Sequence, residues 1–362
     1  MTSPARGDWD VDWAIAARTG RRLIHPGPEV SAAEARAAVN ELAECAERAH
    51  ELVRRTAELD VRGVTTSPTL VTGRRGWIGA NVESMRGLIG AAPGRATRSS
   101  PTGLAAGVQL GALLSWMGTK VLGQYDPFHV GSDGDGREVG RLLLVAPNVV
   151  RAERDIEAVT RDFRLWVCLH EETHRVQFGH TGWLVDYLRD LATELINDPE
   201  LTNAGVTDLI RQARRDVPTG QRSLVDLLPS DRARTTIDRI TAVMSLLEGH
   251  ADVVMDRVGP EVIGTVAQIR RRFDRRRESS GLDKVLRRVL GMDLKMAQYR
   301  DGAKFCRTVI DRSSMTTFNR VWTSPNTLPT LAEIHRPELW LDRLGWQPPR
   351  AESPESPSRP GV

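Results

Sequence analysis

The sequence predicts a mainly α-helical protein with a small β element, and three observations lead to this prediction. Apolar residues recur every three or four positions through most of the 362-residue chain, a period typical of amphipathic helices. Only residues 141–146, Arg-Leu-Leu-Leu-Val-Ala followed by Pro147, have the composition of a buried strand. Farther along the chain, the sequence His170-Glu-Glu-Thr-His174 places two histidines one helical turn apart. We therefore expect a helical domain whose small β element lies beside the helix with the two histidines.

Helices are expected throughout the N-terminal part of the chain. Residues 8–23, with Trp9 and Trp13, are predicted to form a short helix that docks on the body of the protein. Ser31 and Glu34 have the spacing of a capping box, which opens an amphipathic helix that continues to about residue 59. A third helix is expected at residues 76–89. Residues 91–101 are rich in glycine, proline and serine and are predicted to form a linker.

Residues 103–122 form an apolar stretch with Gly103, Gly107 and Gly111 at four-residue spacing, which is common where membrane helices pack closely. However, Gln109 and Ser115 interrupt this stretch, and Lys120 lies near its end. We therefore expect a buried helix that packs through its glycines, and no membrane span.

The C-terminal half is also predicted to be helical. Helices are expected at residues 183–196, 204–215 and 231–258, and helical patterns continue at residues 282–290 and 296–309. The basic run at residues 270–277 is expected to be a solvated helix face. Residues 348–362, rich in proline, serine and glutamate, are predicted to be a disordered tail, which leaves residues 1–347 as a single domain.

The composition is that of a soluble globular protein, with 40% hydrophobic and 27% charged residues. A formal net charge of +3 is too small to indicate a nucleic-acid partner. The three cysteines are scattered, so neither a disulfide framework nor a cysteine-based metal site is expected. The N-terminal residues lack the pattern of a secretory signal, and we expect a cytoplasmic protein. The oligomeric state is left open.

The His170-Glu-Glu-Thr-His174 motif predicts a hydrolytic zinc site. On a helix, side chains four residues apart lie on one face, so His170 and His174 can bind one ion. Zinc lowers the pKa of a bound water to about 7, and a carboxylate beside the ligands can accept that proton as the water attacks a carbonyl. Glu171 has the position required for this general base.

A catalytic zinc site needs a third protein ligand, and the sequence offers several. Glu248 is favoured because it lies on a segment with helical periodicity and because Asp252 follows it one turn later. Asp252 is expected to accept a hydrogen bond from the free nitrogen of a ligand histidine and to orient it. His180 has the outer spacing of a metzincin motif, although Gln177 stands where that motif has glycine. His250 is a weaker alternative, since it points away from Glu248 on the same helix.

Four segments of the chain carry a resemblance to a known family. They are residues 121–126 (Val-Leu-Gly-Gln-Tyr-Asp), 166–178 (Trp-Val-Cys-Leu-His-Glu-Glu-Thr-His-Arg-Val-Gln-Phe), 246–252 (Leu-Leu-Glu-Gly-His-Ala-Asp) and 294–302 (Leu-Lys-Met-Ala-Gln-Tyr-Arg-Asp-Gly). Over about residues 9–344, the chain resembles the zincin-like metalloproteases of actinobacteria, whose members are often labelled hydrolases associated with deazaflavin coenzyme biosynthesis. The resemblance implies a zincin-like helical domain in which His170, His174 and Glu248 bind zinc and Glu171 is the base.

The function predicted from the sequence is a zinc-dependent metalloprotease or related amide hydrolase that acts on a peptide or protein. In zincins, a strand beside the metal helix can pair with an extended substrate, so residues 141–146 are expected to offer a substrate-binding edge. Two alternatives remain open. One is a non-catalytic scaffold stabilised by zinc. The other is a di-iron carboxylate protein, because Glu47 and His50 form a second Glu-x-x-His pair in addition to Glu171 and His174.

Overall fold

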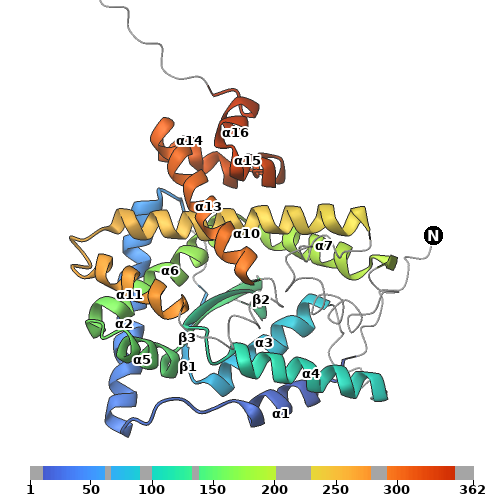
Figure 1. Ribbon diagram of the computed structural model, residues 1–362, viewed down its shortest axis with the longest axis vertical. Helices are drawn as coiled ribbons and strands as arrows, with labels where there is room; N and C mark the ends of the chain where they lie inside the picture. Colours follow the sequence, from blue (N-terminus) through green and yellow to red (C-terminus); the bar gives the residue numbers. More distant parts are fainter. Residues whose placement is uncertain are drawn as a thin grey trace, which may run out of the picture.

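A small three-stranded sheet separates two groups of helices in the computed structural model, which describes residues 11–61, 67–89, 100–132, 138–200, 230–278 and 292–346 (Figure 1). The strand order is β1 (Thr69–Thr72), β3 (Glu138–Val145), β2 (Gly123–Ser132). Strand β1 is parallel to β3, and β2 is antiparallel to it. The prediction that residues 141–146 offer a substrate-binding edge is therefore wrong, because β3 is the central strand and forms hydrogen bonds along both edges.

Strand β3 is apolar on both faces because each face covers a separate hydrophobic core. Leu142 and Leu144 point into the larger core, which is formed with the helices that surround the two histidines. Leu143 and Val145 point into a smaller core on the other face. This explains why the strand has a continuous apolar run instead of alternating polar and apolar residues.

The smaller core lies under α1 (Trp13–Leu23), α3 (Arg74–Ile89) and α4 (Pro101–Met117). Helix α4 packs on α1 through its glycines, as the sequence predicts. A β-carbon at Gly107 would lie 2.5 Å from the Asp12 carbonyl oxygen, and one at Gly111 would lie 2.6 Å from that of Ala16. The opposite face of α4 is more exposed than predicted, since Val108 is 49% exposed. None of the described helices combines the length and apolar character that crossing a membrane requires.

The larger core is built by long helices on the other face of the sheet. The predicted capping box opens α2, because the Ser31 backbone N–H donates to the Glu34 carboxylate at 2.7 Å and the Glu34 N–H donates to Ser31 Oγ at 3.2 Å. Helix α10 begins and ends at the predicted residues, and the Ser230 hydroxyl caps its first turn. These helices are α2 (Ala32–Ala57), α5 (Ala146–Asp155), α6 (Thr160–His180), α7 (Leu184–Ile196), α10 (Asp231–Val258), α11 (Val266–Glu278) and α13 (Met292–Arg312).

Helices α10 and α13 cross at two glycines. A β-carbon on Gly249 would overlap the backbone of Gly302, and a β-carbon on Gly302 would overlap the carbonyl group of Ser245. The two backbones are therefore in direct contact, which requires glycine at both positions. Glycine at position 249 is therefore explained by the close packing of α10 on α13.

Several short elements follow α13 and lie at the top of Figure 1. They are α14 (Met315–Phe318), η2 (Asn319–Trp322), η3 (Pro325–Thr327), α15 (Leu331–His335) and α16 (Pro337–Arg343). Phe318 and Trp340 anchor them, since both side chains are fully buried. The predicted helices at 204–215 and 282–290, the tail at 348–362 and most of the linker at 91–101 fall outside the described residues. The division into one domain and a tail stays a prediction.

Candidate metal centre

Helix α6 carries the two motif histidines and is held firmly between its neighbours. Its residues are buried on most sides, so it packs against α2, α5, α10 and the sheet. The Arg164 guanidinium fixes the first half of the helix, because it pairs with Glu153 on α5 at 2.8 Å and with Glu41 on α2 at 2.6 Å. The pair with Glu153 is buried and the pair with Glu41 is partly exposed, and together they fix the half of α6 that precedes the histidines.

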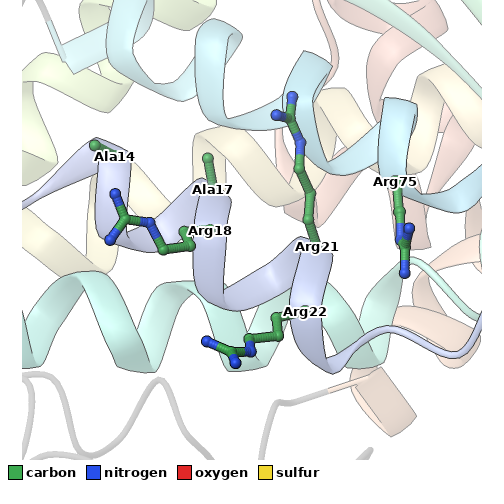
Figure 2. A pocket seen from close by; sticks show the side chains of 6 residues that line it. All are labelled: Ala14, Ala17, Arg18, Arg21, Arg22 and Arg75. Carbon is green, nitrogen blue, oxygen red and sulfur yellow. The ribbon is translucent and has the colours of Figure 1, made fainter.

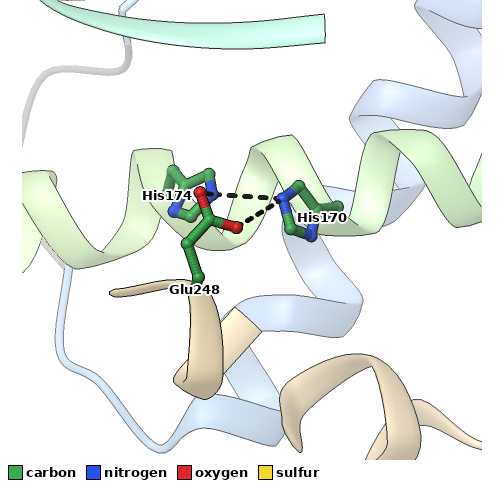
Figure 3. Close-up of side chains that lie close together, drawn as sticks. All are labelled: His170, His174 and Glu248. Carbon is green, nitrogen blue, oxygen red and sulfur yellow. Dashed lines mark hydrogen bonds and ion pairs between the residues drawn. The ribbon is translucent and has the colours of Figure 1, made fainter. Parts of the chain in front are cut away.

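His170, His174 and Glu248 lie together, as the sequence predicts (Figure 3). The two Nε2 atoms are 3.3 Å apart, and Glu248 reaches across from α10 to place its two carboxylate oxygens 3.3 Å from His170 Nε2 and 3.9 Å from His174 Nε2. One ligand atom from each residue lies within 4.8 Å of the other two. The side chains are 28%, 13% and 19% exposed, so the cluster is partly open to solvent.

Two of the three separations within the cluster match those expected around a zinc ion. Two atoms bound to one zinc at about 2.0–2.1 Å in tetrahedral geometry are about 3.3–3.4 Å apart. The distance between the histidine nitrogens and that from His170 to Glu248 both have this value, whereas His174 Nε2 lies 3.9 Å from the other oxygen of Glu248. Two imidazoles and one carboxylate are also a ligand set found in catalytic zinc sites. His170, His174 and Glu248 would therefore hold the ion.

The electrostatics of the cluster favour positive charge. Burial opposes the charged form of His170, but the hydrogen bond and the charge of Glu248 outweigh this and raise the His170 pKa to about 9. At His174, burial dominates and lowers the pKa, which favours the neutral imidazole. The Glu248 carboxylate thus stabilises a cation at the point where both histidines converge.

Glu171 lies outside the ligand set, against strand β2. Its carboxylate accepts a hydrogen bond from the backbone N–H of Tyr125, and burial raises its pKa to about 7. Gly123 makes room for this side chain, since a β-carbon there would lie 2.5 Å from Glu171 Cγ. A carboxyl group with a pKa near neutrality is suited to accept and release a proton.

The other candidate ligands occupy different surroundings. His180 contacts the carbonyl oxygen of Asp60 at 2.8 Å through Nδ1 and is not part of the cluster. His250 is fully buried, burial lowers its pKa to about 3, and its Nδ1 lies 2.9 Å from the Gln177 side chain. The Asp252 carboxylate lies 3.8 Å from Arg270, and its charge contributes to the raised pKa of His170. Its predicted role in orienting a ligand histidine stays a prediction.

The second Glu-x-x-His pair of the chain does not join the cluster. His50 Nδ1 lies 2.5 Å from Glu172, a fully buried carboxylate that also pairs with Arg175 at 2.7 Å. Glu47 is exposed on α2. The described residues therefore give no support to a di-iron site built from both pairs.

Sequence reasoning missed Gln177 and Gly123 as parts of the centre. Gln177 bridges His174 and α10, and it was noticed only as a departure from the metzincin pattern. Gly123 leaves room for the Glu171 side chain, and the two residues lie far apart in the chain. No local pattern marks either residue, because each acts through an element that approaches only in the folded protein.

A surface hollow of about 580 Å³ lies elsewhere, on α1 and the start of α3. Its guanidinium groups point in different directions and do not converge on one point (Figure 2). It is therefore distinct from the metal centre. The residues that line it are Ala14, Ala17, Arg18, Arg21, Arg22 and Arg75.

The fold and the cluster together define a mostly helical protein with a ligand set of the zinc-hydrolase type. Residues 11–341 match the family of zincin-like metallopeptidases, and the chain belongs to this family. It is also similar to the crystal structure of a candidate hydrolase with a novel fold from Chloroflexus aurantiacus, with 27% identity and a TM-score of 0.65. That match covers 93% of this chain and 99% of the other. No curated protein matches the sequence.

Proposed function

We propose that the protein is a zinc-dependent metallopeptidase or a related amide hydrolase in which Glu171 is the general base. The observation that carries this proposal is the geometry of the cluster, in which three side chains from two helices bring one ligand atom each within 4.8 Å of one another. Two of the separations are 3.3 Å. The family of the chain supports the same class of reaction. We further propose that His170, His174 and Glu248 are the zinc ligands.

The surroundings of Glu171 support catalysis over a purely structural ion. A structural zinc site needs only its ligands and is normally closed. Here Gly123 and the Tyr125 N–H hold an additional carboxylate beside the two histidines, and that carboxylate is not one of the three clustered ligands. A group held in this way, with a pKa near 7, is what proton transfer at neutral pH requires.

The chemistry divides between the ion and the chain. When bound, zinc supplies Lewis-acid polarisation of a carbonyl and activation of water. Glu171 accepts the proton of the attacking water and can then donate it to the leaving amine. The Tyr125 N–H keeps the Glu171 carboxylate beside the cluster during these steps.

Strand β2 is the strand that we propose to bind an extended substrate. It lies at an edge of the sheet, its residues 123–126 pair with β3, and the strand contacts the metal helix α6. An extended peptide can add to such an edge by main-chain hydrogen bonds. We therefore propose β2, and not residues 141–146, as the substrate-binding edge. A cytoplasmic location stays a prediction from the sequence.

The proposal is tested with purified wild type and Glu171→Gln. Metal analysis should give one zinc per chain for both proteins, because Glu171 is not a ligand. A digest of an unbiased peptide library should yield a cleaved sequence for the wild type. On that peptide, the zinc-loaded variant should turn over about 10²–10⁴-fold more slowly. If the loaded variant cleaves as fast as the wild type, Glu171 is not the base; a wild type that binds no zinc would contradict the whole proposal.

A further inference from the structure

Gln177 forms a buried connection between His174 and helix α10. Its Oε1 lies 2.9 Å from His174 Nδ1, on the side of the ring opposite the metal cluster. Its Nε2 lies 2.9 Å from the carbonyl oxygen of Leu247 and 2.9 Å from Nδ1 of His250. Gln177 and His250 are both fully buried, so water does not compete for these hydrogen bonds.

The Leu247 carbonyl determines the direction of the whole chain of hydrogen bonds. A carbonyl oxygen can only accept, so the group of Gln177 that faces it must be the NH₂ end of the amide. Oε1 then faces His174 and can only accept, which requires His174 Nδ1 to carry a proton. A neutral imidazole protonated at Nδ1 has its lone pair at Nε2, the atom that faces His170 and Glu248.

His250 completes the arrangement from the other side. The second N–H of the Gln177 amide points at His250 Nδ1, which must accept, and His250 is therefore protonated at Nε2. The rings of Phe318 and Trp322 pack on His250, with centroids at 5.2 and 5.4 Å, and hold it in place. The Gln177 amide thus has a fixed acceptor for each of its two protons.

We propose that Gln177 is a positioning residue, which accepts the Nδ1 proton of His174 and so presents the His174 Nε2 lone pair to the metal. The proposal rests on the proposed zinc site and deepens it, because it assigns the group that selects the tautomer of one ligand. Leu247 immediately precedes Glu248, so one turn of α10 supplies both a ligand and the carbonyl that orients another ligand. Partners of this kind commonly contribute about 10–100-fold to metal affinity.

The first test needs neither zinc nor activity. In metal-free wild type with ¹⁵N-labelled histidine, long-range ¹H–¹⁵N spectra distinguish an imidazole protonated at Nδ1 from one protonated at Nε2. We expect neutral His174 to be the Nδ1–H tautomer and His250 the Nε2–H tautomer. A His174 that is mainly Nε2–H would overturn the proposal, even if the protein binds zinc and cleaves peptides. Conversely, the expected tautomers in a protein that binds no zinc would contradict only the proposed function.

The second test compares Gln177→Met with Gln177→Glu. Both variants have nearly the shape of glutamine and both lose the NH₂ group, but only glutamate keeps an oxygen that accepts from His174. Competition with a chelator should give a zinc dissociation constant about 10–100-fold higher for Gln177→Met than for wild type, and a smaller loss for Gln177→Glu. His174 should keep the Nδ1–H tautomer in Gln177→Glu and lose this preference in Gln177→Met. Equal zinc affinity in wild type and Gln177→Met, or no difference between the two variants, would overturn the proposal.

Discussion

Gly123 and Glu171 are in direct contact although 48 positions separate them in the chain. The edge strand β2 passes so close to α6 that a β-carbon on Gly123 would lie 2.5 Å from Glu171 Cγ and 2.9 Å from its Cδ. The Tyr125 N–H of the same strand donates to the Glu171 carboxylate. The backbone of β2 therefore sets the position of the proposed base, and only glycine at position 123 permits it.

We expect Gly123→Ala to lower turnover while zinc binding is retained. The added methyl group displaces Glu171 and breaks its hydrogen bond to Tyr125, and a displacement of about 1 Å can cost about 10²-fold in rate. The measurements are kcat on a cleaved peptide and zinc content. Gly73→Ala is the control, because a β-carbon at Gly73 meets nothing within 4 Å. A Gly123→Ala enzyme with wild-type kcat would show that Glu171 has room to move without consequence.

The ligand set predicts which side chains the metal requires. His170→Ala, His174→Ala and Glu248→Gln should each lose stoichiometric zinc, since each removes one of three protein ligands. His180→Ala should keep its zinc, because His180 contacts the Asp60 carbonyl and lies outside the cluster. Elemental analysis after dialysis distinguishes the two groups. Zinc loss in His180→Ala with retention in Glu248→Gln would indicate a metzincin-like arrangement instead.

Asp252 gives a prediction about ligand orientation. If it acts on a ligand histidine, Asp252→Asn should weaken zinc binding by about 10–100-fold. Asp256→Asn is a matched control, since Asp256 pairs with the same Arg270 at 2.9 Å but lies one turn farther along α10. Similar zinc dissociation constants for the two variants and the wild type would show that Asp252 pairs with Arg270 and does not orient a ligand histidine.

The crossing of α10 and α13 predicts a stability effect at a distance from the metal. We expect Gly302→Ala to lower the free energy of unfolding by about 1–3 kcal/mol, because the methyl group forces two packed backbones apart. The same shift moves Glu248, which neighbours Gly249, so zinc affinity should fall as well. Denaturant unfolding and chelator competition measure the two effects. Gly264→Ala, with nothing within 4 Å of its β-carbon, should change unfolding by less than about 0.5 kcal/mol.

Long helices with strong local signals could be predicted from the sequence. The capping box at Ser31 and the continuous pattern of residues 231–258 produced helices at the expected positions. The two outer strands could not be predicted in this way. Strand β1 has only four residues, and β2 contains glycine and Pro127 and is irregular between Asp126 and Gly131. Both exist because β3 offers hydrogen bonds on each edge, a long-range condition that local sequence does not show.

The residues of the cluster could be predicted from the sequence only where their proximity follows from sequence spacing. The distance between His170 and His174 follows from helix geometry alone. Helical periodicity favours Glu248 over His180 as the third ligand, but sequence spacing does not show that the two helices meet. The packing of α10 on α6 brings Glu248 into the cluster. The roles of Gln177 and Gly123 could not be predicted from the sequence. The first depends on the orientation of the Gln177 amide, and the second depends on the path of the β2 backbone past α6.

The three proposed ligands come from two helices, and Glu248 follows His174 by 74 residues. An ion held by both helices would act as a removable crosslink that closes this long loop, so occupancy and folding would be thermodynamically linked. Above the dissociation constant, each tenfold rise in free zinc would add about 1.4 kcal/mol to the free energy of unfolding. The lifetime of the folded protein would then depend on the concentration of free zinc. A chelator would weaken the packing of α10 on α6 before it affected the helices around the smaller core.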